Sequence, residues 1–173
     1  IASGTGQHII KLAALIPNLI WQPSDIDTAR LNSIVSWSFE KQLPNLLPPI
    51  KLDVTDEGWS ALCPNQDLIL LVNLLHLVSE SEAKVIIDGI SKSLMPGGRC
   101  VIYGPFMRDG FLTSDGDKCF HQSLVEADPD IGYKDDKWML DMFQNYNLEI
   151  VKIANMPANN LAFVIEKNHL KHS

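Results

Sequence analysis

A glycine-rich stretch near the start of the chain, ASGTGQH (residues 2–8), could bind a ligand through its backbone. Gly4 and Gly6 leave the main chain bare where an apolar helical pattern begins. A ligand can approach such a backbone closely and lie at the positive end of the helix. A purely structural turn explains two glycines equally well, because G-x-G alone is a weak signal. The ligand must therefore be identified from the residues that follow.

Two acidic positions follow short predicted strands and suit a nucleoside. Asp25 lies 21 residues after Gly4 and ends the stretch NLIWQPSD, where a carboxylate can accept hydrogen bonds from both ribose hydroxyls. Asp27 could take this role instead, and one of the two could be only a helix cap. Asp53, in LDVT, could reach an adenine amino group or could be a solvated loop residue.

The glycine spacing distinguishes between two nucleoside cofactors. A dinucleotide fold usually carries G-x-G-x-x-G, and here Ile9 stands where the third glycine would be. S-adenosylmethionine has no pyrophosphate, and its amino-acid end can hydrogen-bond to such a loop. The spacing therefore favours S-adenosylmethionine over NAD, which remains a weaker hypothesis.

The segment VNLLH places two polar side chains after the most apolar run of the chain. Asn73 follows the apolar residues that begin at Leu68, so we expect a partner that offsets its desolvation, and a ligand is the favoured one. His76 is either a hydrogen-bonded wall of the site or a general base. We name His76 as a candidate catalytic residue.

Two further segments could contact a substrate. In YGPFMRDG, Tyr103 and Phe106 could line an aromatic rim around a small polar substrate. Tyr103 and Asp109 are candidate catalytic groups and Arg108 is a candidate substrate contact, although an internal ion pair could simply tie this loop down. In MPANN, Asn159 and Asn160 could direct their amides at the substrate or serve only as turn formers.

The order of elements predicts an α/β fold with a doubly wound, mostly parallel sheet. Helices are expected before Pro17, after Asp27, after SESE (79–82), around 120–125 and around 139–146, and MPGG (95–98) is expected as a turn. Ser79 and Glu82 match a capping box. The helix that follows them should bury an apolar face made of Ala83, Ile86, Ile87, Ile90 and Leu94. The last two strands are too close for a parallel crossover and should pair antiparallel. This ending is typical of class I methyltransferases. The expected strands lie within 18–25, 47–56, 67–76, 100–106, 148–154 and 161–167.

The composition describes one ordinary globular domain, expected over residues 1–167 with a polar tail at 168–173. The chain has 173 residues, of which 46% are hydrophobic and 20% charged, and no apolar run is long enough to span a membrane. A net charge of −7 disfavours a nucleic-acid partner. The separated cysteines Cys63, Cys100 and Cys119 fit a reducing compartment, so we expect an intracellular, cytoplasmic protein, or one that also enters the nucleus.

Other chemistries find little support in the sequence. His8, His76 and His121 are far apart, no HExxH motif occurs, and no G-x-S-x-G nucleophile elbow occurs. We therefore expect no metal site and no serine-hydrolase triad.

Taken together, a series of short strings resembles one family closely. They are ASGTGQH, WQPSD, LDVT, MPGG, YGPFMRDG, FHQSL, ADPDIGY and MPANN, in this order. They are similar to an uncharacterised methyltransferase-like family of bacteria and animals, long labelled as a domain of unknown function, and the resemblance covers residues 2–167. Family members carry a first strand before the glycine loop. Only Ile1 and Ala2 precede the loop here, so we expect upstream sequence.

The resemblance implies a class I methyltransferase fold that binds S-adenosylmethionine, and it implies no particular acceptor. By position, the resemblance assigns the cofactor loop to Ser3, Gly4 and Gly6, and the ribose contact to Asp25. It assigns the adenine contact to Asp53, and the wall of the site after the fourth strand to Asn73 and Leu74. Our main hypothesis is methyl transfer to a small-molecule or protein acceptor. The alternative is a non-catalytic protein-interaction module.

Overall fold

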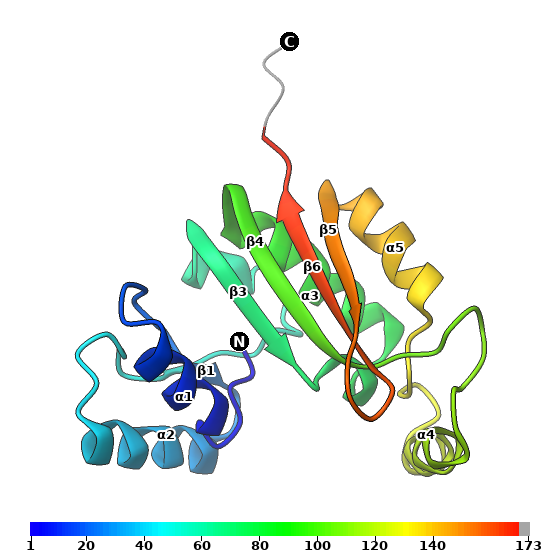
Figure 1. The fold of residues 1–173 in the computed structure, drawn as a ribbon, viewed down its shortest axis with the longest axis horizontal. Helices are drawn as coiled ribbons and strands as arrows, with labels where there is room; N and C mark the ends of the chain where they lie inside the picture. Colours follow the sequence, from blue (N-terminus) through cyan, green and yellow to red (C-terminus); the bar gives the residue numbers. More distant parts are fainter. Residues whose placement is uncertain (170–173) are drawn as a thin grey trace. The chain divides into compact units, whose positions relative to one another are not determined.

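The computed structural model describes residues 1–169 and divides into two compact units, residues 1–54 (unit 1) and residues 55 onward (unit 2) (Figure 1). The expected single domain over residues 1–167 therefore stays a prediction. Residues 170–173 of the predicted polar tail lie outside the described residues.

Unit 1 consists of two helices and a short parallel strand pair. Asp27 caps α2 by accepting hydrogen bonds from the backbone N–H groups of Ala29 and Arg30, as expected of a helix N-cap. The strands pair in parallel, with Ser24 opposite Ile50. In chain order the elements are α1 (Gln7–Leu15), β1 (Ser24–Asp25), α2 (Thr28–Lys41) and β2 (Ile50–Lys51).

Unit 2 is built on a four-stranded sheet with the order β3-β4-β6-β5. Figure 1 shows these strands side by side, with α3 behind the sheet and α5 beside β5. The elements are η1 (Trp59–Leu62), β3 (Gln66–Val72), η2 (Leu75–Leu77), α3 (Glu80–Ser93), β4 (Leu94–Pro105), α4 (Asp115–Ala127), α5 (Asp136–Asn145), β5 (Leu148–Asn155) and β6 (Asn160–Lys167).

The strand directions confirm the mixed α/β arrangement expected from the sequence. β3 pairs in parallel with β4, β4 pairs antiparallel with β6, and β6 pairs antiparallel with β5. The parallel pair needs a crossover, which α3 supplies, whereas the short connection between β5 and β6 allows only a hairpin.

Helix α3 shows how local sequence and core packing agree. Ser79 and Glu82 form the predicted capping box, in which each side chain accepts a hydrogen bond from the other residue's backbone N–H. The residues predicted for the apolar face are buried: Ala83, Ile86, Ile87, Ile90 and, at the start of β4, Leu94.

The helix expected around 120–125 is confirmed and is longer than expected, running from Asp115 to Ala127. Two other local expectations were wrong. The predicted turn at MPGG is the irregular start of β4, because Leu94 already pairs with Gln66 of β3. Phe106, expected on an aromatic rim, is buried and packs edge-on against Phe163.

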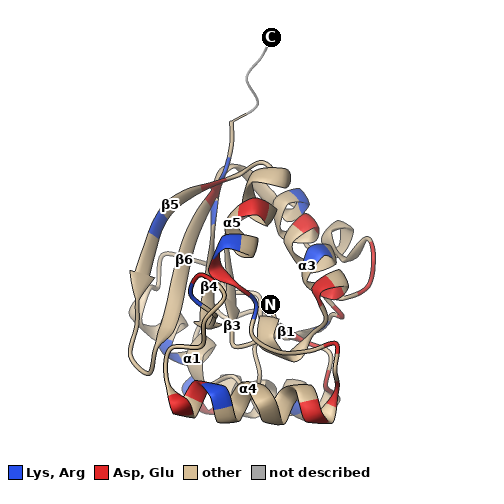
Figure 2. Cartoon of the chain, turned by 90° about the vertical axis from the view of Figure 1, so that its right-hand side faces the viewer, with Lys and Arg blue, Asp and Glu red and all other residues tan. Residues whose placement is uncertain are grey.

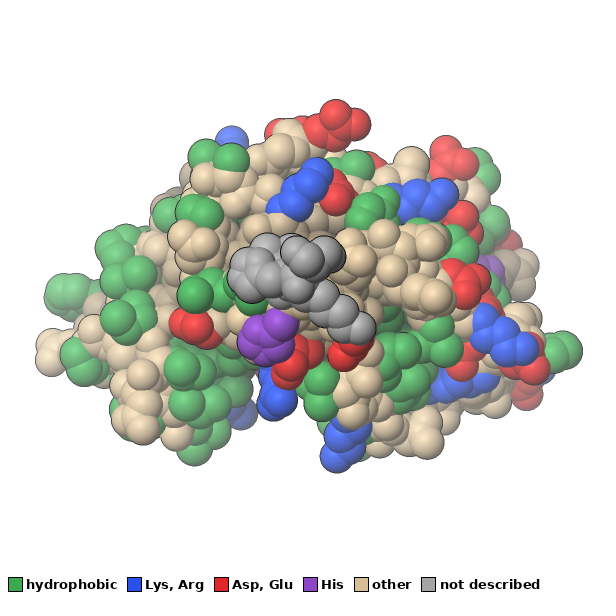
Figure 3. All heavy atoms as spheres, turned by 90° about the horizontal axis from the view of Figure 1, so that it is seen from above, with side chains coloured by type: hydrophobic (Ala, Val, Ile, Leu, Met, Phe, Trp, Pro, Cys, Tyr) green, Lys and Arg blue, Asp and Glu red, His purple; other side chains and the backbone are tan. Residues whose placement is uncertain are grey.

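Charged side chains are interspersed over the surfaces shown. Helix α4 carries acidic residues at both ends and the basic residue Lys118 in its first half (Figure 2), and basic side chains lie among acidic and hydrophobic ones on the face in Figure 3. Whether the protein avoids nucleic acid stays a prediction. Within residues 1–169, none of the helices combines the length and the apolar composition that crossing a membrane requires.

Candidate functional site

The two glycines of the predicted cofactor loop face different surroundings. Gly4 has φ +58°, and a Cβ placed on it would meet no atom within 4 Å. Gly6 has φ +93°, and its Cβ would lie 3.0 Å from a side-chain carbon of Ile34 on α2. Both positions favour glycine by their backbone angles. Gly4 therefore leaves open backbone that a ligand can approach, whereas Gly6 lets the loop pack against a helix.

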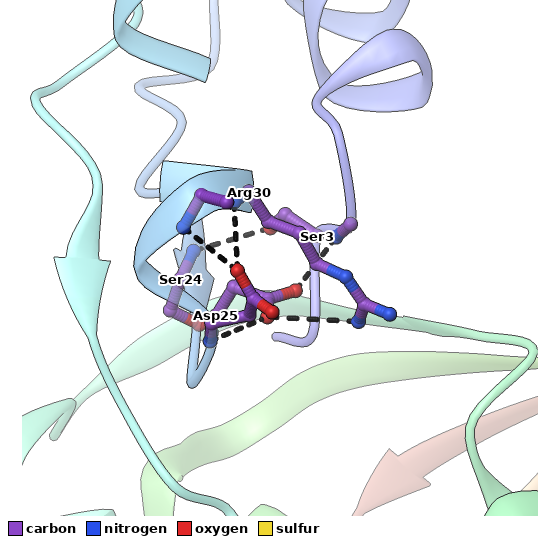
Figure 4. Close-up of polar contacts among 7 residues, drawn as sticks. Ser3, Ser24, Asp25 and Arg30 are labelled. Carbon is purple, nitrogen blue, oxygen red and sulfur yellow. Dashed lines mark hydrogen bonds and ion pairs between the residues drawn. The ribbon is translucent and has the colours of Figure 1, made fainter. Parts of the chain in front are cut away.

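Asp25 holds the glycine loop in place. Its carboxylate accepts hydrogen bonds from the backbone N–H of Gly4 at 2.8 Å and of Asp27 at 3.0 Å, and the residue is 1% exposed. Figure 4 shows the carboxylate between the loop and the first turn of α2, with the guanidinium of Arg30 at 3.7 Å. Asp25 therefore shapes the loop directly, and its contact with a ribose stays a prediction.

Ser3 adds a second connection between the loop and β1. The Ser3 N–H donates to the Ser24 carbonyl at 2.7 Å, and the Ser3 hydroxyl accepts from the Ser24 N–H at 3.1 Å. These bonds lie beside the Asp25 cluster in Figure 4. Asp53, the predicted adenine contact, follows β2 and is half-buried. The structure thus places Ser3, Gly4 and Asp25 together at β1 and Asp53 after β2, whereas Gly6 packs against α2.

In unit 2, Asn73 and Leu74 follow directly after β3. Asn73 is exposed, so the desolvation argument for a partner does not apply to it. Its φ is +55°, a left-handed conformation that Asn tolerates better than most residues, and its N–H donates to the Tyr103 carbonyl. Leu74 is half-buried before η2. Their cofactor contact stays a prediction.

His76 lies on η2 within an aromatic cluster. The residue is 7% exposed, and its ring meets those of Phe120 and Tyr133 edge-on. Burial and the nearby charge of Lys134 lower the pKa of His76 to about 4. The imidazole is therefore neutral at physiological pH, as a wall or a hydrogen-bond acceptor requires, and it is a weaker base than an ordinary histidine.

The structure pairs four predicted acceptor-site residues across β4, the loop after it and the closing hairpin. The Asn160 side-chain amide donates to the Tyr103 hydroxyl at 3.0 Å. Arg108 donates to the carbonyls of Asn159, at 2.9 Å, and Phe106, at 2.8 Å, and burial lowers its pKa. Residues 51 to 57 positions apart in sequence thus meet at one end of β4 and β6.

Asp109 lies apart from this pairing. It is exposed, has φ +52°, and forms an ion pair with Lys137. The internal ion pair considered for this loop thus joins Asp109 to Lys137, while Arg108 bonds to carbonyl groups. An exposed, paired carboxylate gives little support to a role for Asp109 as the base, which stays a prediction.

Sequence reasoning missed Asp117, the centre of a hydrogen-bond network. Its carboxylate accepts from the side chains of Thr113 and Ser114 at 2.7 Å, Asn159 at 3.0 Å and Tyr133 at 3.2 Å. Burial raises its pKa, but these four bonds outweigh burial and lower it. The signal available in the sequence was the S-x-x-D spacing of a helix N-cap, which does not reveal partners at 133 and 159.

We predict that Asp117→Ala destabilises the protein by about 2 kcal/mol at pH 7, because four donors lose their acceptor. The lowered pKa means that this stabilisation is complete above the ordinary value of 3.8 and declines as the pH falls through the folded-state value. Urea unfolding of both proteins at pH 7 and pH 3 measures this. The difference in the free energy of unfolding between the wild-type protein and Asp117→Ala should shrink at pH 3. A difference that grows on acidification would contradict the network.

Among residues 1–169, no cluster of three or more His, Cys, Asp or Glu side chains could hold a metal ion. Cys100 is fully buried, and burial raises its pKa to about 12.

Comparison with known proteins places this geometry in context. A family model described as "Protein of unknown function (DUF938)" matches residues 1–167. An O-methyltransferase family protein from Burkholderia thailandensis matches 98% of this chain at 16% identity, with a TM-score of 0.83. An O-methyltransferase family 2 protein from Planctomyces limnophilus, solved in complex with apigenin, matches 96% at 16% identity, with a TM-score of 0.82.

A third solved structure, PigF with SAH, matches 96% of the chain at 15% identity, with a TM-score of 0.79. The chain spans about half the length of these structures, 48–50%. At such identities the matches show the fold, and the fold is the one that the order of strands and helices predicted.

Proposed function

The chain belongs to the DUF938 family, with the α/β fold of class I methyltransferases, and from this premise we propose that it is an S-adenosylmethionine-dependent methyltransferase. The acceptor we propose is a small molecule with a reactive oxygen or nitrogen atom. The main support for the proposal is the open backbone at Gly4, whose N–H donates to the buried carboxylate of Asp25. The non-catalytic alternative gains no support from structural neighbours that are O-methyltransferases.

The residues of unit 1 fit the recognition of this cofactor. At Gly4 the space that a side chain would fill is open, so the methionine end of the cofactor can approach the loop backbone. Asp25 uses one lone pair on each oxygen for a backbone N–H, and a carboxylate has further lone pairs for ribose hydroxyls. Asp53 follows the neighbouring strand β2, where it serves the adenine side of the same nucleoside.

The residues of unit 2 supply the acceptor chemistry that we propose. When bound, the cofactor provides an electrophilic methyl group on a sulfonium ion, so the protein chiefly has to orient the acceptor. Neutral His76 accepts a hydrogen bond from the acceptor hydroxyl and so orients it. Tyr103 and the amide of Asn160, already hydrogen-bonded to each other, and Arg108 position the acceptor's polar groups.

Calorimetric titration of the full chain with S-adenosylhomocysteine tests the proposal. We expect binding with a Kd in the micromolar range and one site per chain. The folded state is verified by circular dichroism in the same sample, and adenosine alone serves as the control ligand. Absence of heat at millimolar ligand from a folded protein would refute cofactor binding and, with it, the proposed activity.

A further inference from the structure

Lys134 is a buried cation to which neither the sequence nor the proposed chemistry assigns a role. It is 5% exposed and follows Tyr133 in the segment between α4 and α5. Its ammonium group donates to two carbonyl oxygens, that of Val78 at 2.6 Å and that of Gly132 at 3.0 Å. The two carbonyl oxygens accept from two of its three N–H groups without cancelling its charge, and a buried charge of this kind is costly to keep. A lysine buried at this energetic cost is expected to have a specific role in the structure.

Both carbonyls that Lys134 joins belong to residues close to His76. Val78 directly follows the turn η2 that carries His76, and the Gly132 N–H donates to the His76 carbonyl at 3.1 Å. The Lys134 carbonyl in turn accepts from the Met107 N–H at 2.9 Å, which anchors this segment to the loop after β4. Lys134 therefore connects the turn that carries His76 to a segment that is itself fixed in place.

The residues beside Lys134 make this segment rigid. Gly132 has φ +140°, and a Cβ on it would lie 2.8 Å from the His121 ring, so no side chain fits there. The Tyr133 N–H donates to His121 Nδ1 at 3.1 Å, and the Tyr133 ring packs edge-on against those of His76 and His121. The segment thus holds both the backbone and the ring of His76.

We propose that Lys134 is a positioning residue, which clamps the η2 turn and keeps the His76 imidazole neutral and correctly oriented toward the acceptor. The part of this inference that concerns the acceptor rests on the proposed methyltransferase function. The clamp itself rests on the hydrogen bonds of Lys134 and Gly132 alone.

The charges around the clamp support this electrostatic role. Burial lowers the pKa of Lys134, and the carboxylates of Glu80 and Glu82 at the start of α3 offset part of this by favouring its charged form. Around His76 lie Lys134, the Tyr133 phenol and the uncharged Phe120 ring. Among the groups that the structure shows around His76, Lys134 is the cation that opposes its protonation.

The test follows the titration of His76 by NMR in the wild-type protein and in Lys134→Met and Lys134→Arg, with His76→Gln used only to assign the signal. We expect the wild-type signal to stay at its neutral position down to about pH 5. In Lys134→Met the midpoint should rise by about one pH unit, because the opposing charge is gone. In Lys134→Arg, which keeps the charge, the midpoint should stay low.

Two outcomes would overturn the inference: an unchanged midpoint in folded Lys134→Met, or a wild-type midpoint near 6.5. If Lys134→Met does not fold, Lys134→Gln and the wild-type midpoint decide the question. Binding of S-adenosylhomocysteine is measured on the same samples and should not change. Failure of the wild-type protein to bind it would reject the proposed function, whereas the titration would still decide the clamp.

Discussion

Replacing Asp25 with alanine is expected to lower the affinity for S-adenosylhomocysteine by about a hundredfold and the free energy of unfolding by about 3 kcal/mol. The substitution removes the acceptor for the Gly4 and Asp27 backbone N–H groups, in a position that is 1% exposed. Two donors then lose a buried partner, and the loop loses the group that shapes it. Calorimetry measures the affinity, and urea unfolding measures the stability.

Asp27→Ala is the matched control for this experiment. Asp27 lies two residues away and caps α2 by accepting from Ala29 and Arg30, so its loss weakens the helix start without freeing the Gly4 N–H. We expect a smaller loss of stability and unchanged affinity. If Asp27→Ala loses affinity and Asp25→Ala does not, Asp27 rather than Asp25 contacts the ribose. If both variants bind normally, neither residue at this end of β1 belongs to the cofactor site.

The second large effect is expected from the two loop glycines, which should fail in different ways. Gly6→Ala places a methyl group 3.0 Å from the Ile34 side chain at φ +93°, so we expect a loss of about 3 kcal/mol in stability. Gly4→Ala meets no atom within 4 Å, and its cost should be only about 1 kcal/mol from its φ of +58°. Thermal and urea unfolding of both variants measure this difference.

Ligand binding should rank the two glycine variants in the opposite order. The methyl group of Gly4→Ala occupies the space through which a ligand reaches the loop backbone, so the affinity for S-adenosylhomocysteine should fall at least about tenfold. Gly6→Ala, measured at a temperature where it is folded, should bind more tightly than Gly4→Ala. Full affinity in Gly4→Ala would show that the open space is not used by the cofactor.

The fold followed from the sequence because its signals are local. The capping box at Ser79, the N-cap at Asp27 and the short connection between β5 and β6 (residues 156–159), which allows only an antiparallel hairpin, each depend on neighbours within a few positions. Apolar periodicity likewise identified the buried face of α3. The order of strands and helices, and with it the fold class, was therefore available before any coordinates.

Which candidate residues act together was decided only by the tertiary structure. The sequence marked Asn159 and Asn160 as one motif, but their side chains bond to Asp117 and Tyr103, 42 and 57 positions away. In the sequence, Lys134 looks like an ordinary lysine in a loop. Its proposed role depends on its hydrogen bond to the carbonyl of Val78, 56 positions away. Local propensity carries no information about such contacts, because they form only when the sheet brings distant loops to one edge.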